Sequence, residues 1–482
     1  MPAEQFDVLI IGAGLSGIGA AYHLQKECPK KSYAILETRE CIGGTWDLFR
    51  YPGIRSDSDM YTLGYPFRPW KDGKAIADGP SILHYIRDTA KEFGIDRKIL
   101  YQYRVVGASW SSTDSQWTVD IERGPERELI QITCRFLYLC TGYYDYEAGY
   151  LPEFPGKEKY QGRMVHPQKW TGDIDYAGQR VLVIGSGATA VTLVPELAKT
   201  ATHVTMLQRT PTYVVSMPTE DRLANGMRRL LPGKLAHSLS RWKNVMQSML
   251  FYQISRRAPG LAKKLIRKGV EAELGQSFDM KHFTPNYNPW DQRLCVVPDG
   301  DMFKAIKQGT VDIVTDHIDT FTEKGVRLKS GAEIEADLIV TATGLKLKLI
   351  GGMQLVVDGK KVDPPQCKVY KGMMLSDVPN LAFAVGYTNA SWTLKADLSN
   401  SYLCRVINYM DQRGYSRCVP RVRGEMKEAP LMDFTSGYVQ RELANLPKQG
   451  SKAPWKLYQN YILDLFTLRY RSVTDCMEFT RN

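Results

Sequence analysis

Residues 6–17 read F-D-V-L-I-I-G-A-G-L-S-G, and this stretch decides the fold. A short apolar run that meets glycine is typical of a buried parallel strand. Gly12, Gly14 and Gly17 form a G-x-G-x-x-G pattern, and a helical stretch continues to about Lys26. We expect Gly12 to permit a tight turn and Gly14 to let the backbone approach a pyrophosphate. Gly17 is expected to let the helix that follows pack closely on the strand.

The next apolar run, S-Y-A-I-L-E, predicts a second strand that ends in an acid. Glu37 lies 20 residues beyond Gly17. A carboxylate there accepts hydrogen bonds from ribose hydroxyls and repels a 2′-phosphate, while the helix N-terminus offers N–H donors to the phosphates. The strand–turn–helix–strand order predicts a dinucleotide fold, to which we assign FAD. The alternative is a glycine-rich turn in some other α/β sheet.

A second dinucleotide pattern occurs further along the chain. Residues 180–185 read R-V-L-V-I-G, and Gly185, Gly187 and Ala190 follow the pattern G-x-G-x-x-A. The next strand ends in Q-R, which places Arg209 where the first fold has its acid. A guanidinium suits a bidentate contact with a 2′-phosphate, so this fold is predicted to take NADPH. The alternative for Arg209 is a solvated surface arginine.

Three later apolar runs indicate how the two folds are connected. The runs that end at Gly142 and Gly344 are typical of the strands that close the two nucleotide-binding sheets. The run that ends at Gly386 is typical of a late strand that brings the chain back to the first sheet. The expected fold class is α/β, with two Rossmann-like domains, the NADP domain inserted into a discontinuous FAD domain, and a helical insertion. The predicted boundaries are 1–148 and 346–482 for the FAD domain, 149–221 and 276–345 for the NADP domain, and 222–275 for the helical insertion.

Composition narrows the class of protein. The 482 residues contain 43% hydrophobic and 24% charged residues, which is ordinary for two or three globular domains. The nine cysteines include no C-x-x-C pair, which disfavours a disulfide scaffold or structural zinc site and fits reduced thiols in a cytoplasm. We expect no metal site, signal peptide or membrane span, and no nucleic-acid-binding module is recognisable.

The net charge of +11 is concentrated in one segment. Residues 222–275 carry twelve Lys or Arg and two acids, Glu271 and Glu273, for a net charge of +10. Apolar residues recur there at steps of three and four, as in amphipathic helices. The favoured interpretation is a solvated basic helical face over a core. Weak contact with an anionic membrane surface, or steering of the tetra-anionic NADPH, are the alternatives.

The segment 43–57, G-G-T-W-D-L-F-R-Y-P-G-I-R-S-D, narrows the chemistry. It resembles the first fingerprint of type I Baeyer–Villiger monooxygenases, and we call it the first-fingerprint segment. The fixed positions are met by Gly43, Gly44, Trp46, Tyr51, Pro52, Gly53 and Asp57. The second fingerprint is matched at Gly162, His166 and Trp170, and departs at Tyr160 and Thr171. From about residue 6 to residue 460 the chain resembles the bacterial ethionamide-activating branch of this family.

The resemblance implies an FAD- and NADPH-dependent monooxygenase that inserts one atom of O2 through a C4a-peroxyflavin. Ketones become esters or lactones, and sulfides or thioamides are S-oxygenated. The alternative enzyme is an N- or S-oxygenating flavin monooxygenase without Baeyer–Villiger activity. A third hypothesis is a non-catalytic redox-sensing or membrane-surface protein that kept a flavin fold, supported only by the positive charge.

The resemblance also places the catalytic residues. Arg293, in N-P-W-D-Q-R, is expected to stabilise the anionic oxygen species and the developing alkoxide, because a guanidinium keeps its proton. Gln292 stands where relatives often have lysine, which removes one contact that a lysine would make to NADP. Asp57 is expected to orient Arg293. The alternatives are a loop pair between Arg293 and Asp291, and an ordinary helix N-cap at Ser56 or Asp57.

The remaining expected contacts follow from the same resemblance. Trp46 lies by the flavin ring or serves only for packing, His166 acts in the link between domains, and Trp392 lines the substrate pocket. The predicted cofactor-binding residues are Gly12, Gly14, Ser16, Gly17, Glu37, Gly44, Thr45, Trp46, Asp47, Arg55, Ser56, Asp57 and Val105 with Gly185, Ser186, Gly187, Ala188, Thr189, Ala190, Gln208 and Arg209.

Overall fold

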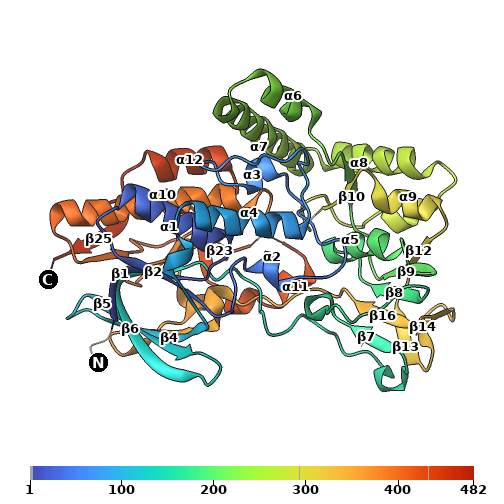
Figure 1. The fold of residues 1–482 in the computed structure, drawn as a ribbon, viewed down its shortest axis with the longest axis horizontal. Helices are drawn as coiled ribbons and strands as arrows, with labels where there is room; N and C mark the ends of the chain where they lie inside the picture. Colours follow the sequence, from blue (N-terminus) through green and yellow to red (C-terminus); the bar gives the residue numbers. More distant parts are fainter. Residues whose placement is uncertain (1–3, 293, 433, 482) are drawn as a thin grey trace.

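The structure is a computed structural model that describes residues 4–292, 294–432 and 434–481. It contains two α/β units side by side, each built on a sheet with a parallel core (Figure 1). Both chain termini lie beside the first sheet, so the chain leaves this unit and later returns to it. The expected α/β fold class is confirmed.

The first sheet has nine strands and begins with the predicted nucleotide strand. β1 (Glu4–Ile11) pairs in parallel with β2 (Tyr33–Glu37) and with β6 (Glu128–Leu139). β4 and β5 extend it as an antiparallel meander, and β21 returns to pair with β6. The remaining strands of this sheet are β3 (Ile99–Tyr101), β4 (Tyr103–Ser111), β5 (Gln116–Arg123), β17 (Gln354–Val357), β18 (Lys360–Lys361) and β21 (Leu381–Phe383).

The apolar run of β1 is buried on both faces because two different cores lie against it. Successive side chains of a strand point to opposite faces. Val8 and Ile10 therefore join the cluster under the helices, whereas Leu9 and Ile11 join the cluster under the meander. The helices on the first face are α1 (Leu15–Glu27), α4 (Gly79–Glu92) and α10 (Trp392–Arg413).

A buried histidine joins α1 to α10. His23 Nδ1 lies 2.6 Å from Glu27 Oε1, and its Nε2 lies 2.9 Å from Asp397 Oδ1. Burial alone would lower the pKa of His23, but the hydrogen bonds and charges of Asp397 and Glu27 raise this pKa to about 9. Because the pKa is raised on folding, the contribution to stability is complete below the unfolded value of about 6.5 and is lost as pH rises towards 9.

We therefore expect His23→Gln to lose most stability at pH ~6.5 and below. The difference from wild type should be on the order of 3 kcal/mol below pH ~6.5 and should shrink as pH rises to ~9. Urea unfolding across this pH range measures it. His84→Gln is the matched control, since His84 is exposed and pairs with Asp88 on the surface of α4. A difference that stays constant with pH would contradict the assignment.

The second sheet is entirely parallel. Its order is β12-β9-β8-β16-β7, and the predicted second nucleotide strand, β8, lies at its centre. α5 (Ala188–Leu197) follows β8, and α9 (Asp301–Lys307) precedes β12. The five strands are β7 (Arg163–Val165), β8 (Arg180–Ile184), β9 (His203–Gln208), β12 (Val311–Thr315) and β16 (Leu338–Thr341).

The chain passes between the two units twice, and the two passages run together. The Asp145 N–H donates to the Lys346 carbonyl at 2.9 Å, and the Tyr150 N–H donates to the Gly344 carbonyl at 3.0 Å. His166 Nε2 contacts the same Gly344 carbonyl at 3.1 Å, while its Nδ1 accepts from the backbone. His166 of the second fingerprint thus lies where the two passages meet. The exact domain boundaries stay predictions.

Residues 222–275 form three helices along one side of the molecule (Figure 1). These are α6 (Arg222–Leu230), α7 (Gly233–Arg257) and α8 (Pro259–Leu274), and α7 packs on the short helix α3 (Met60–Leu63). Several large apolar side chains of these helices face solvent, so the expected core-facing apolar stripe is wrong for much of its length. Within the described ranges, no helix combines the length and apolarity that crossing a bilayer requires.

The remaining elements are short. β10 and β11 form a parallel pair, β13, β14 and β15 form an antiparallel sheet, and α12 packs on α10. Their bounds, with those of the other small elements, are α2 (Thr45–Leu48), β10 (Val214–Met217), β11 (Cys295–Pro298), β13 (Ile318–Thr322), β14 (Gly325–Leu328), β15 (Glu333–Glu335), β19 (Val369–Tyr370), β20 (Met374–Leu375), β22 (Arg417–Pro420), β23 (Glu428–Pro430), α11 (Gly437–Gln440), β24 (Lys448–Gly450), α12 (Tyr461–Arg469) and β25 (Met477–Thr480).

Candidate active site

The first nucleotide turn has the glycine geometry that its sequence predicts. Gly12 has φ +106°, and a Cβ there would lie 2.6 Å from the Cys140 carbonyl oxygen. A Cβ on Gly17 would lie 1.9 Å from the Gly12 carbonyl oxygen, so α1 and β1 meet only because no side chain stands between them. Gly14 is the N-cap of α1, and no side chain caps this helix within the described part of the chain. The first-turn N–H groups of α1 are therefore available to a phosphate.

Glu37 ends β2 beside this turn. Its side chain is nearly inaccessible, with 5% exposure of the residue. One carboxylate oxygen accepts the Ala13 N–H at 2.7 Å, and the other accepts the Arg39 N–H at 3.0 Å. Burial raises the pKa of Glu37 above its ordinary value, partly offset by these hydrogen bonds. An acceptor fixed at this position suits the hydroxyls of a ribose.

The first-fingerprint segment packs between the two nucleotide folds. At one end, a Cβ on Gly44, which has φ +56°, would lie 3.1 Å from Gly14 Cα of the first turn. At the other end, a Cβ on Gly53 would lie 3.0 Å from Glu196 Cβ and 3.1 Å from the Thr192 carbonyl oxygen of α5. The segment that carries the fingerprint therefore touches both dinucleotide units, where a flavin and a nicotinamide would have to meet.

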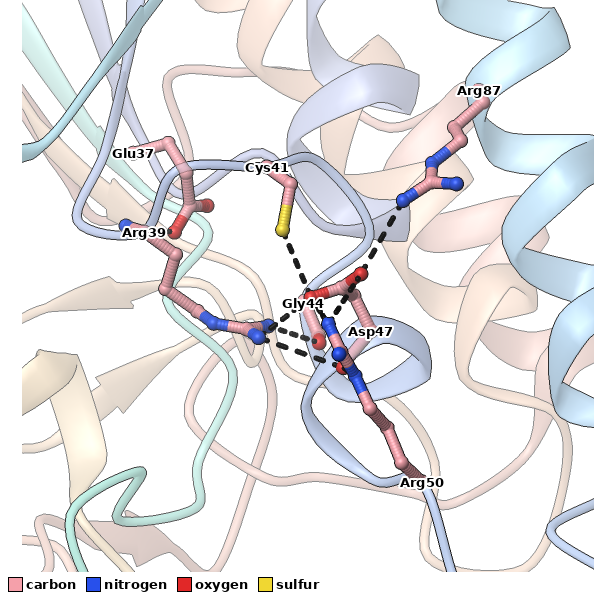
Figure 2. A network of polar contacts seen from close by, with 7 residues as sticks. All are labelled: Glu37, Arg39, Cys41, Gly44, Asp47, Arg50 and Arg87. Atoms are coloured by element: carbon pink, nitrogen blue, oxygen red, sulfur yellow. Dashed lines mark hydrogen bonds and ion pairs between the residues drawn. The ribbon is translucent and has the colours of Figure 1, made fainter. Parts of the chain in front are cut away.

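Asp47 holds this segment in place through a buried carboxylate that contacts three arginines (Figure 2). The carboxylate is 2% exposed and lies 2.6 Å from Arg39, 3.3 Å from Arg50 and 3.4 Å from Arg87. Cys41 Sγ donates to the same carboxylate at 2.9 Å. Burial alone would raise the pKa of Asp47, but the Cys41 hydrogen bond and the arginine charges lower it overall. The predicted contact of Asp47 with FAD stays a prediction, since its carboxylate is engaged by the protein.

The end of the first-fingerprint segment reaches the second unit. Arg55 donates to Asp301 in the first turn of α9 at 2.5 Å. Ser56 is buried in the same loop, and Asp57 is exposed beside it. Asp59, not Ser56 or Asp57, caps α3, so the N-cap alternative for those two residues is wrong. The predicted roles of Arg55, Ser56 and Asp57 at the cofactors remain predictions.

An aromatic group lies against the first turn. Trp392 begins α10, and its Nε1 donates to Ser16 Oγ in α1 at 2.7 Å. The Trp392 ring stacks on Tyr143, with ring centroids 5.0 Å apart. Trp46, the tryptophan of the first-fingerprint segment, is half-buried and packs against the helical core of the first unit. Trp392 thus lies next to Ser16, a predicted flavin contact. Val105, another predicted cofactor contact, is buried on β4.

The second nucleotide turn has the same construction. Gly185 has φ +135°, and a Cβ there would lie 2.3 Å from the Ala342 carbonyl oxygen. Gly187 is the N-cap of α5 with open space around its Cα, and Ala190 is buried in the helix. Ser186 Oγ contacts the Thr210 carbonyl at 3.0 Å, while Ala188 and Thr189 form the first turn of α5. The turn leaves the helix N-terminus open to a phosphate.

Gln208 ends β9 and Arg209 follows it, and the two side chains lie in different environments. Gln208 is buried, and its amide nitrogen donates to the His282 carbonyl at 2.8 Å and to Thr315 Oγ1 at 2.9 Å. Arg209 is exposed, which fits either a 2′-phosphate contact or a solvated surface arginine. Arg293 lies outside the described residues. Its expected neighbour Asp291 forms an ion pair with Arg256 of α7 at 2.7 Å.

The comparisons with known proteins agree with this arrangement. Residues 64–386 match the flavin-binding monooxygenase-like family, and residues 10–76 match an NAD(P)-binding Rossmann-like domain. The chain belongs to the flavin-binding monooxygenase-like family. It is 53% identical over 475 residues to the FAD-containing monooxygenase EthA of Mycobacterium tuberculosis, covering 98% of this chain and 97% of that protein. It is also 53% identical to EthA of Mycolicibacterium smegmatis, covering 99% and 98%. Because the members of this family are flavin monooxygenases, the chain is an enzyme.

Solved structures show the same fold at low identity. A steroid monooxygenase bound to NADP superposes with a TM-score of 0.78 at 20% identity, covering 99% of this chain and all of that one. An ε-caprolactone-bound cyclohexanone monooxygenase superposes with a TM-score of 0.76 at 19% identity, with the same coverage. At such identities the likeness concerns the fold, and it confirms the two-unit architecture predicted for this flavin monooxygenase.

The sequence alone did not reveal several parts of this site. Arg87 reaches Asp47 from α4, 40 residues away in the chain, so no local spacing could reveal the contact. Arg39 and Arg50 flank the first-fingerprint segment, but arginine on a loop is ordinary and carries no signal of its own. The Trp392–Ser16 hydrogen bond joins residues 376 positions apart. These contacts hold the backbone of the first-fingerprint segment and of the first turn in place.

Proposed function

We propose that this flavin monooxygenase is of the Baeyer–Villiger type. It converts ketones to esters or lactones and S-oxygenates sulfides or thioamides, with FAD and NADPH as cofactors and O2 as oxidant. The observation that carries the proposal is the first-fingerprint segment, which packs on the first nucleotide turn at Gly44 and on α5 at Gly53. The whole-chain identity to EthA supports it as well. The proposed compartment is the cytoplasm, in keeping with nine free cysteines.

The residues present fit the two cofactors. Both turns place a glycine where a Cβ would collide with neighbouring backbone, at the Cys140 carbonyl for Gly12 and at the Ala342 carbonyl for Gly185. Among the described residues, no side chain caps the helix that follows either turn. Glu37 would accept from the ribose of FAD, and Arg209 would donate to the 2′-phosphate of NADPH. When bound, FAD reduced by NADPH supplies the activation of O2.

The protein side of the mechanism is positioning and charge. Asp47 and its arginines hold the backbone around Gly44, and the Arg55–Asp301 pair ties the same segment to the second unit. Arg293 would hold a fixed positive charge at the oxygen atoms that become negative, and Asp57 would orient it. One charge pair at ~4 Å and an effective dielectric of ~20 contributes about 4 kcal/mol before desolvation. Trp392 would shield the flavin side from water.

A product panel tests this function. Purified holoenzyme is given NADPH, O2 and in turn a simple ketone, a sulfide, a thioamide and a tertiary amine. Baeyer–Villiger function predicts ester from the ketone, with one O2 and one NADPH consumed for each ester formed. S-oxide or N-oxide without ester would instead identify an N- or S-oxygenating enzyme. NADPH oxidation that yields only hydrogen peroxide with all four compounds would contradict both.

Arg293→Ala tests the catalytic assignment. Loss of the fixed charge should lower ester formation by about a hundredfold or more, while FAD remains bound in stoichiometric amount. Flavin reduction by NADPH under anaerobic conditions should change much less, because that step precedes attack on the ketone. Gln292→Ala, at the neighbouring position, is the matched control. An unchanged rate of ester formation would remove Arg293 from the mechanism.

A further inference from the structure

The long helix α7 carries its apolar residues on the outside. Leu235, Leu239, Trp242, Met246 and Leu250 have exposed fractions between 41% and 62%. They recur at steps of four, three, four and four residues, which places them on one face of the helix. A helix on a water-soluble protein normally turns such a face towards the core.

The opposite face of α7 is polar and buried. His237, Ser240, Arg241 and Asn244 are all buried against the rest of the protein. Arg241 Nη1 donates to the carbonyls at the end of α3, at 2.8 Å for Tyr61 and 2.9 Å for Gly64. This buried anchor fixes the rotation of α7. The outward position of the apolar stripe is therefore a property of the fold, because the helix could turn the stripe inwards only by breaking the Arg241 contacts.

Neighbouring helices also carry exposed apolar residues. Figure 1 shows α12, α6, α7 and α8 along one side of the molecule. The ring centroids of Trp242 and of Tyr461, at the start of α12, lie 5.9 Å apart, so α12 begins beside the α7 stripe. The exposed large apolar residues of the three neighbours are Leu223 and Leu230 on α6, Leu261 and Leu265 on α8, and Leu463, Phe466 and Tyr470 on α12 or just after it. We call these residues and the α7 stripe the docking face.

Unpaired positive charge lies on the same helices. The segment 222–275 has a net charge of +10. Six of its exposed cations form no ion pair within the part of the chain that the structure describes. They are Arg222, Arg229, Lys234, Arg257, Lys264 and Lys268. Lys264 and Lys268 lie three and seven residues after Leu261 on α8, so the cations flank the apolar residues of the docking face.

We propose that the docking face binds the surface of an anionic phospholipid membrane. Large apolar side chains flanked by Lys and Arg on surface helices are the pattern of interfacial binding, in which the apolar face enters the headgroup region. Each cation near such a surface adds about 1 kcal/mol. A second copy of the chain is a poor occupant, because its docking face would bring the same net positive charge against this one. The proposal does not depend on which substrate the enzyme oxidises.

Vesicle sedimentation of the holoenzyme tests the proposal. Vesicles of phosphatidylcholine alone are compared with vesicles containing about 30% phosphatidylglycerol. We expect binding to the anionic vesicles only, weakened by about tenfold or more as salt rises from ~0.05 to ~0.5 M because the charges are screened. Absence of binding to anionic vesicles at low salt would overturn the proposal.

Paired variants identify the surface responsible. Leu239→Gln with Leu250→Gln, and separately Lys264→Glu with Lys268→Glu, should each reduce anionic-vesicle binding by about tenfold or more. The controls are Leu129→Gln with Leu151→Gln and Lys360→Glu with Lys361→Glu, which alter exposed residues outside the docking face and should bind like wild type. NADPH oxidation without vesicles should be unchanged in all four.

The same variants separate the rival occupants. If the docking face instead joins two copies, light scattering would show a dimer that the Leu239→Gln, Leu250→Gln variant dissociates, and vesicle binding would be absent. That result would overturn the proposal, as would equal loss of vesicle binding in the control variants. Wild-type holoenzyme that binds anionic vesicles but forms no ester from ketones would count against the proposed function alone.

Discussion

Gly17→Ala is expected to give a protein that contains no flavin. The new Cβ would lie 1.9 Å from the Gly12 carbonyl oxygen, whereas real contacts of this kind are essentially never below 3.0 Å. The obstacle is backbone at the end of β1, so no side-chain rotation can relieve it. The helix must move away from the strand, and the cradle for the pyrophosphate is then lost. FAD absorbance per chain and NADPH oxidation measure the effect, and both should fall to background.

A glycine in open space is the matched control. Gly226 lies inside α6, and a Cβ added there would have nothing within 4 Å, so Gly226→Ala should keep full flavin content. It should also be slightly more stable, by up to about 1 kcal/mol, because alanine favours a helix over glycine. Stoichiometric FAD in the Gly17→Ala protein would show that the first turn is not the flavin cradle.

The first turn was predictable because its constraints are local. Gly12 and Gly17 are required by the backbone geometry of one turn, so their spacing is visible in the sequence. The same holds for Gly185 in the second turn. The strands that end at Glu37 and Gln208 were also predictable, since each is a short apolar run bounded by turn residues.

Features that depend on distant parts of the chain were not predictable. Apolar periodicity in 222–275 identifies helices correctly, but it does not say which face meets the protein. In α7 the choice was made by Arg241, whose guanidinium satisfies carbonyls at the end of α3, about 180 residues earlier in the chain. The same limit applies to Asp47. The first fingerprint draws attention to Asp47, but its partner Arg87 lies on α4, which the fingerprint does not include.

Asp47→Asn is expected to destabilise the protein by about 2 kcal/mol at pH 7, because the buried carboxylate loses its charge-assisted hydrogen bonds while Arg50 and Arg87 stay solvated. The neutral amide would face three guanidinium groups, and its NH2 cannot accept from them. Arg39 also donates to the Gly44 carbonyl at 3.3 Å, so loosening Arg39 should weaken FAD binding too. Urea unfolding and FAD titration of the apoprotein measure the two effects.

The pH dependence distinguishes a lost charge from a general packing defect. The pKa of Asp47 is lowered on folding, so its contribution is present above the ordinary value of about 3.8 and is lost as pH falls through the folded pKa. The difference between wild type and Asp47→Asn should therefore shrink below pH ~4. Asp173→Asn is the control, because Asp173 pairs with Arg163 at 2.8 Å on the surface and should cost less than ~1 kcal/mol. Equal stabilities of the two variants at pH 7 would mean that the arginines around Asp47 do not depend on its charge.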